Sequence, residues 1–285
     1  MTQPTHHKAE FWSVYDKDRK LVKCELCPKF CIIKDDEKGF CKVRKNINGE
    51  LFALVYGKLI SMAVDPMEKK PLFHFMPGTP ILSISTVGCN LGCLHCQNWE
   101  IARGDPEEDP FRNVKTVTPE EIVDQAKIAG CKSIAYTYVE PTIFYEYIYD
   151  TAKLAKKAGI KNVMVTNGFI NPEPLKKLYP YIDAANIDLK GFTKEFYRQI
   201  CAADLEPVLN TIKTLKELGT THMEITNLLI PTKNDDPEKI KEMCEWIKDN
   251  VGTDVPLHFS KFSPMYKLSD LPPTPEETIH KARDI

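Results

Sequence analysis

Short apolar runs rich in β-branched residues alternate with helix-like stretches from residue 81 onward. We expect strands at 81–87, 133–139, 161–167, 184–190, 222–230 and 256–262. Helix signals stand between them. Residues 118–121 (TPEE), for example, combine an N-cap threonine, a proline at the first helical position and acidic residues in the first turn. Further helices are expected over 142–158, from 171, over 206–218, from 236 to about 250, and from 274.

Six alternating strand and helix units predict a parallel sheet with helices packed outside it. Six units are too few for the closed eight-fold barrel, so we expect an α/β fold of the open, partial (β/α)6 barrel type. Residues 81–285 would form this barrel. Residues 1–60 would form a small cysteine-rich segment, and residues 61–80, with four prolines, a connecting loop. The chain stops at Ile285 inside its last expected helix, so we expect the barrel to be truncated there.

Composition narrows the class of protein. The 285-residue chain has a formal charge of −2, which gives no electrostatic footprint for nucleic acid. No run approaches the roughly 20 apolar residues that span a bilayer, and the polar N-terminus has no signal-peptide core. We therefore expect a cytoplasmic protein that binds neither nucleic acid nor membrane. Lysine pairs such as 69–70 are expected on solvated faces.

Ten cysteines in a reducing compartment need a chemical reason, and three of them follow the first expected strand. Cys89, Cys93 and Cys96 have the spacing C-x3-C-x2-C. Three thiolates on one loop suit three irons of a 4Fe–4S cluster and leave the fourth iron open. Zinc is the alternative, but it prefers four closing ligands. His95, between two of the cysteines, is badly placed to serve as the fourth.

A second group of cysteines lies in the N-terminal segment. Cys24, Cys27, Cys31 and Cys41 have the spacing C-x2-C-x3-C-x9-C. Four thiols this close together predict a metal site that helps a small segment to fold. Both zinc and an auxiliary iron–sulfur cluster fit four thiolates, so the metal stays open.

Polar residues follow the next expected strands, at the ends where a barrel of this kind has its active site. Glu140 follows the second strand, Thr166, Asn167 and Gly168 the third, and Asp188 and Lys190 the fourth. The structural alternatives are a helix-capping role for Glu140 and a mutual ion pair for Asp188 and Lys190. His258, on the last strand, is expected either as a core histidine or beside a bound nucleoside.

These residues resemble the radical S-adenosylmethionine (radical SAM) superfamily. The strings CELCPKFC, GFCKVR, YTYVEPTIFYEY, VTNGFI, DLKGF and EITNLLIPTKND are similar, in this order, to radical SAM enzymes of the AmmeMemoRadiSam system, within the pyruvate formate-lyase activating enzyme-like branch. The resemblance runs from about Cys24 to the C-terminus. It differs where the glycines of a Gly-Gly-Glu-type motif are replaced by Tyr138 and Val139.

The resemblance implies a 4Fe–4S cluster on Cys89, Cys93 and Cys96 whose open iron is chelated by S-adenosylmethionine. It places Glu140 at the methionyl amino group and His95 beside the adenine. The turn at 166–168, Asp188, Lys190 and His258 are further candidates for binding the cofactor. It also implies reductive cleavage to a 5′-deoxyadenosyl radical that abstracts hydrogen from a substrate.

The reaction partner is less defined than the chemistry. We expect an unidentified substrate, with activation of a glycyl radical enzyme, a protein partner, as the alternative. A non-catalytic zinc or iron–sulfur protein is the alternative of another class. The electron donor would be a protein such as flavodoxin or ferredoxin, and no individual catalytic residue is assigned.

Overall fold

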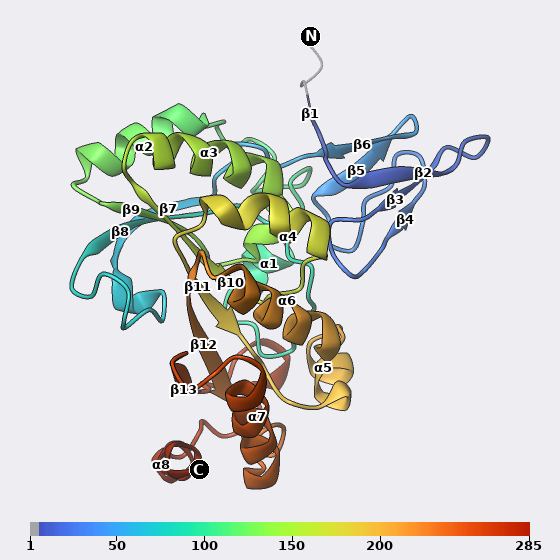
Figure 1. Ribbon diagram of the computed structural model, residues 1–285. Helices are drawn as coiled ribbons and strands as arrows, with labels where there is room; N and C mark the ends of the chain where they lie inside the picture. Colours follow the sequence, from blue (N-terminus) through green and yellow to red (C-terminus); the bar gives the residue numbers. More distant parts are fainter. Residues whose placement is uncertain (1–5) are drawn as a thin grey trace.

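The computed structural model describes residues 6–285 and is organised around a seven-stranded sheet (Figure 1). Its strand order is β13-β12-β11-β10-β9-β8-β7, and every neighbouring pair from β8 to β13 is parallel. The expected open, six-stranded parallel sheet is thereby confirmed. The parallel strands are β8 (Pro80–Ser85), β9 (Ser133–Tyr136), β10 (Lys161–Thr166), β11 (Ala184–Asp188), β12 (His222–Leu229) and β13 (Leu257–Lys261).

The expectation of a loop over residues 61–80 is wrong for its first part. Strand β7 (Ser61–Pro66) pairs antiparallel with β8 along its whole length, and a short 3₁₀ helix, η1 (Met67–Lys69), follows. β7 is an edge strand, so Pro66 at its end removes no hydrogen bond that the sheet needs. The side chains of Met62 and Val64 are exposed, which hides the strand pattern in the sequence.

Helices cover one face of the sheet. Ile84, Tyr136, Ile187 and Ile225 point to this face and are fully buried in the main core. The helices are α1 (Trp99–Ala102), α2 (Pro119–Ile128), α3 (Tyr145–Lys157), α4 (Pro172–Leu178), α5 (Lys194–Ile200), α6 (Leu205–Leu218), α7 (Pro237–Asn250) and α8 (Glu276–Asp284), with 3₁₀ turns η2 (Pro141–Phe144), η3 (Tyr179–Tyr181) and η4 (Tyr266–Leu268).

The opposite, inner face of the sheet is covered near the beginnings of the strands by the segment 67–79. Met67 and Leu72 of this segment form a small separate core with Ile81, Val163 and Ala184. Since the cysteine motif follows the other end of β8, the segment lies toward the opposite end of the barrel. It therefore acts as a floor, which we call the floor segment.

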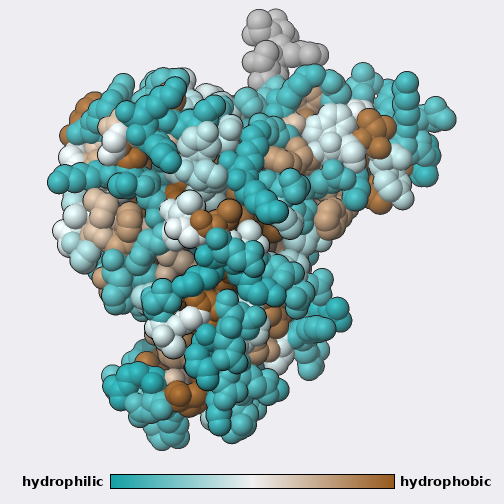
Figure 2. All heavy atoms as spheres, viewed as in Figure 1, coloured by the Kyte–Doolittle hydropathy of each residue, from teal (hydrophilic) through white to brown (hydrophobic). Residues whose placement is uncertain are grey.

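The N-terminal part forms a lobe of two three-stranded antiparallel sheets. A buried ion pair between Arg44 of the lobe and Glu146 of α3 joins it to the barrel. Figure 1 shows the lobe in blue beside α3 and α4, and Figure 2 shows hydrophilic residues over most of the visible surface. The described helices include none long and apolar enough to cross a membrane. The lobe's strands are β1 (His7–Lys8), β2 (Trp12–Asp16), β3 (Leu21–Cys24), β4 (Ile32–Ile33), β5 (Arg44–Ile47) and β6 (Glu50–Ala53).

Candidate metal and cofactor site

The loop carrying Cys89, Cys93 and Cys96 lies between β8 and α1, and all three thiol residues are partly buried. The Arg103 guanidinium donates hydrogen bonds to the carbonyl oxygens of Cys89, at 2.9 Å, and Leu91, at 2.6 Å. Burial raises the pKa of the Cys89 thiol to about 12, so binding a metal there must release a proton. Sequence reasoning missed Arg103, which lies outside every motif.

The same loop is fixed from its other side by the end of α5. The backbone N–H of Gly92 donates to the carbonyl of Cys201 at 2.8 Å, and that of Leu94 to the carbonyl of Ile200 at 2.9 Å. Two separate parts of the chain therefore hold the backbone of the cysteine loop. The geometry of the three thiols is set by the fold around them.

Glu140, which follows β9, lies at the centre of a buried hydrogen-bond network. Its Oε1 accepts from the N–H of Thr142 at 3.0 Å, the Thr142 hydroxyl at 2.6 Å and the Thr166 hydroxyl at 2.8 Å; its Oε2 accepts from the N–H of Asn167 at 2.7 Å. The residue is 4% exposed, and burial raises its pKa. Glu140 thus ties the end of β9 to the turn after β10. A contact with the methionyl amino group stays a prediction.

The turn at 166–168 is connected to the cysteine loop by Asn90. The Asn167 side-chain amide donates to Asn90 Oδ1 at 2.9 Å, and the Asn90 amide donates to the carbonyl of Phe169 at 2.8 Å. Gly168 has φ +68°, a conformation that glycine adopts without strain. The structure therefore brings Glu140, the turn and the cysteine loop together. Asn90 was missed, and its place beside Cys89 was the available signal.

Asp188 and Lys190 form an ion pair, with Lys190 Nζ 2.9 Å from Asp188 Oδ2. This ion pair is the structural alternative that the sequence offered for the two residues. Burial opposes the charge of Lys190, but Asp188 and the nearby Cys93 and Cys201 hold the pKa of the ammonium well above its usual range. The cation therefore lies close to the thiol Cys93, where it can offset negative charge on bound thiolates.

His95 is buried beside this ion pair. It is 5% exposed, and burial, assisted by Lys190, lowers its pKa to about 3, so the imidazole is neutral. Its Nδ1 atom has no hydrogen-bond partner among residues 6–285. A buried polar atom without a partner is costly, and a polar atom of a bound ligand would satisfy it. The cysteine loop therefore offers a buried, unpartnered nitrogen to a polar atom of a bound ligand.

The structure does not bring His258 to this network. Its Nε2 lies 2.6 Å from Glu224 Oε2, and its ring packs near Phe73 and His74 of the floor segment. His258 is thus a member of a separate polar cluster near the beginnings of β12 and β13. A role beside a nucleoside has no support from these contacts.

The N-terminal cysteines Cys24, Cys27, Cys31 and Cys41 line one pocket, of about 370 Å³ including space open to solvent. Asn90 lines the same pocket, so the two cysteine sites adjoin. A Cβ on Gly88 would lie 2.6 Å from the carbonyl oxygen of Cys41, which leaves room only for glycine. The lobe therefore packs directly against the residue before Cys89.

Comparison with known proteins identifies the class. The sequence profile of the Radical SAM superfamily matches residues 83–247, which is more than half of the chain and includes the cysteine loop and the strand ends after it. The chain belongs to the radical SAM superfamily. This membership implies a 4Fe–4S cluster and S-adenosylmethionine as cofactors.

Individual relatives add detail. The chain is 51% identical to an uncharacterized protein, MJ0808, of Methanocaldococcus jannaschii over 272 residues, 95% of this chain and 80% of the relative. It is 22% identical to pyruvate formate-lyase 1-activating enzyme of Escherichia coli K12 over 70% of this chain and 85% of the enzyme. The crystal structure of Streptococcus suis SuiB bound to S-adenosylmethionine superposes with a TM-score of 0.54 at 16% identity, over 70% of this chain and 44% of SuiB. The resemblance to the superfamily and its activating-enzyme branch is confirmed.

Proposed function

We propose that the protein is a radical SAM enzyme that reductively cleaves S-adenosylmethionine at a 4Fe–4S cluster on Cys89, Cys93 and Cys96. When bound, these groups supply an electron and a 5′-deoxyadenosyl radical that removes hydrogen from a substrate. The observation that carries the proposal is the cysteine loop at the end of β8, held from both sides and connected through Asn90 to the turn at 166–168.

The chain's own residues would bind and orient the cofactor. The neutral His95 offers its unpartnered Nδ1 to a polar atom of the ligand. The Lys190 ammonium, paired with Asp188, balances the charge of the thiolates. Glu140 acts as a positioning residue, because its oxygens already accept hydrogen bonds from the neighbouring strand ends. The buried surroundings of His95 and the turn at 166–168 exclude water from the reacting atoms.

The substrate is proposed only by class. We favour an unidentified substrate in the cytoplasm. A flavodoxin- or ferredoxin-type protein would donate the electron that cleaves the cofactor. Activation of a glycyl radical enzyme is the second candidate, and the similarity to an activating enzyme supports it. A persistent glycyl radical in a candidate partner protein, seen by electron paramagnetic resonance after incubation, would distinguish the second candidate from the first.

The N-terminal thiols are proposed to hold an iron–sulfur cluster rather than zinc. Thiolates around one zinc ion, with Zn–S bonds of about 2.3 Å, lie roughly 3.8 Å apart. Within residues 6–285, three or more Cys, His, Asp or Glu ligand atoms come within 4.8 Å of one another only at His74, Glu224 and His258. No three of the N-terminal thiols, all of which lie within the described residues, therefore come as close together as one zinc ion requires, and we take this to favour a cluster. Its place beside Asn90 suits a relay of electrons to the first cluster.

The test is anaerobic reconstitution with iron and sulfide, followed by reduction in the presence of S-adenosylmethionine and quantification of 5′-deoxyadenosine. The Cys93→Ala variant should form no product, whereas the matched control Cys244→Ala, on α7 away from both cysteine groups, should form it at the normal rate. Product formation by Cys93→Ala, or a wild-type protein that binds zinc but no iron, would contradict the proposal and favour the non-catalytic alternative.

A further inference from the structure

Glu224 of β12 is a completely buried carboxylate on the inner face of the sheet. Its oxygens accept hydrogen bonds from two backbone N–H groups of the floor segment, those of Phe73 at 3.1 Å and His74 at 2.8 Å. These two N–H groups partly meet the hydrogen-bonding needs of the buried carboxylate.

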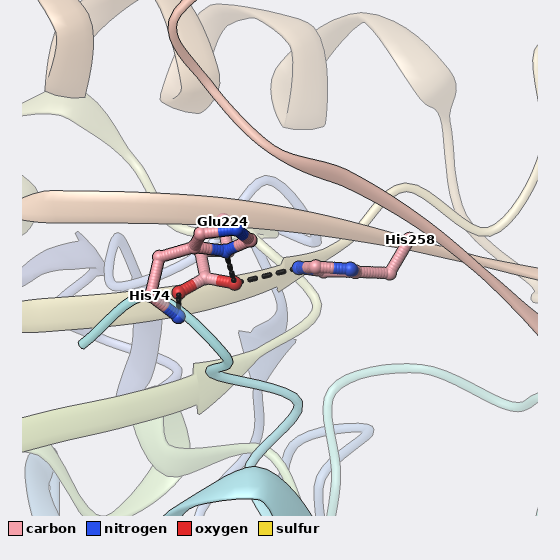
Figure 3. Close-up of side chains that lie close together, drawn as sticks. All are labelled: His74, Glu224 and His258. Carbon is pink, nitrogen blue, oxygen red and sulfur yellow. Dashed lines mark hydrogen bonds and ion pairs between the residues drawn. The ribbon is translucent and has the colours of Figure 1, made fainter. Parts of the chain in front are cut away.

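Three imidazoles also converge on this one carboxylate. His258 Nε2 lies 2.6 Å and His74 Nδ1 3.2 Å from Glu224 Oε2, while His222 Nε2 lies 3.0 Å from Oε1. Figure 3 shows that His74 and His258 approach the carboxylate from the floor segment and from β13. The ligand atoms of His74, Glu224 and His258 all lie within 4.8 Å of one another.

This donor set matches a transition-metal site. Two histidines and one carboxylate are the protein ligands of many zinc and non-haem iron centres. Ligand atoms bonded to one such ion at about 2.1 Å lie roughly 3 to 3.5 Å apart. The separation of His74 from Glu224 Oε2, 3.2 Å, already lies in this range, and that of His258, 2.6 Å, would have to widen by about 0.4 Å or more.

The surroundings are those of a metal site as well. His222 contacts the second oxygen of Glu224, which is how an outer residue orients a ligating carboxylate. The His74 side chain is 59% exposed, so water can reach the remaining coordination positions. His74 lies on the floor segment, whereas Glu224 and His258 lie on the neighbouring strands β12 and β13.

We propose that His74, Glu224 and His258 bind one divalent transition-metal ion, zinc or ferrous iron, at a site separate from both cysteine groups. The ion would clip the floor segment to β12 and β13. The proposal stands independently of the proposed radical chemistry, because it uses none of the residues around the cysteine loop.

Cobalt(II) is the probe, since thiolate ligands give it intense near-ultraviolet charge-transfer bands and nitrogen and oxygen ligands do not. Full-length protein with its clusters reconstituted anaerobically is freed of excess metal and titrated with cobalt(II). One equivalent should bind with visible d–d bands and no new thiolate bands. Competition by zinc(II) and by iron(II) then ranks the two metals.

His74→Ala and His258→Ala should each weaken cobalt binding by more than about 100-fold, and His222→Ala by about 10- to 100-fold. The control His280→Ala, which removes an exposed histidine of α8, should bind as the wild type does. His74 is largely exposed, so His74→Ala should fold normally, which circular dichroism checks. Equal binding by wild type and His74→Ala, or bands of thiolate ligation only, would overturn the proposal and leave a hydrogen-bonded histidine cluster.

Discussion

The Glu140 carboxylate and the backbone N–H of Asn167 are joined by a 2.7 Å hydrogen bond between the ends of β9 and β10. Both residues are buried, and Asn167 continues the connection to Asn90 in the cysteine loop. One carboxylate therefore links three loops of the barrel. We expect Glu140 to affect activity by holding these neighbouring loops in position.

Glu140→Gln should reduce both stability and cofactor binding. The glutamine amide places an N–H₂ group against donors that now face a carboxylate oxygen, which costs about 1–3 kcal/mol in the free energy of unfolding. We expect a raised KM for S-adenosylmethionine and slower formation of 5′-deoxyadenosine. The exposed Glu120→Gln on α2 is the control. Unchanged kinetics in Glu140→Gln would show that the network does not position the cofactor.

The buried pair of Asp65 and Lys70 should make stability depend on acid pH. Burial opposes the charge of Asp65, but hydrogen bonds from Lys69, Lys70 and Tyr138 lower its pKa below the usual range. Because the folded pKa lies below the unfolded one, this stabilisation is present above about pH 4 and is lost as the pH falls. Urea unfolding between pH 6 and pH 2 should show a smaller pH dependence for Asp65→Asn than for wild type.

The same variant should also lower stability at neutral pH. Asp65→Asn leaves the Lys70 ammonium buried without its carboxylate, which costs about 3–5 kcal/mol. Lys69→Ala removes an exposed partner of the same carboxylate and should cost about 1 kcal/mol or less. Equal losses of unfolding free energy in the two variants would mean that leaving Lys70 buried without its carboxylate does not destabilise the protein.

Gly88→Ala should disturb the contact between the lobe and the cysteine loop. Gly88 has φ +95°, and a Cβ there would lie 2.6 Å from the carbonyl oxygen of Cys41. Gly130 also has a positive φ, of +68°, but nothing within 4 Å of its Cβ position, so Gly130→Ala serves as the control for backbone strain alone, about 1–2 kcal/mol. Gly88→Ala should lose more stability and retain less iron after reconstitution; matching values for the two variants would argue against the close contact.

Iron counting should separate the two alternatives for the N-terminal site. Reconstituted wild-type protein should contain about eight irons per chain, and Cys27→Ser about four. Elemental analysis of both proteins, together with Cys131→Ser as a control outside the two cysteine groups, gives the measurement. About four irons and one zinc in the wild type would identify the N-terminal site as zinc.

The sequence predicted those parts of the fold whose signals are local. Apolar runs located all six parallel strands, and spacing located the cysteine loop. Strand β7 was not predicted, because its Met62 and Val64 side chains are exposed and the strand is defined only by its pairing with β8. Lys70 was expected on a solvated face and this was wrong: it is 1% exposed, because Asp65 compensates its charge. Such pairings depend on the register between distant segments, which no local pattern contains.

The site was predicted to a similar extent. Glu140 and the turn at 166–168 were found from their place after strands, and the structure brings them together. Arg103 donates to two carbonyl oxygens of the cysteine loop and Asn90 donates to the carbonyl of Phe169; such contacts with the backbone give no signal in the residue types alone. The cluster of His74 and His258 joins positions 184 residues apart and needed the three-dimensional fold.

The hydrogen bonds from Gly92 and Leu94 to the end of α5 have a consequence for how the protein acquires its iron. Since the fold itself shapes the loop, little chain entropy remains to be lost when the metal arrives. Oxidation that removes the iron should therefore leave a folded site that can bind a new cluster. Repair would then require only iron, sulfide and a reductant, and no refolding of the barrel.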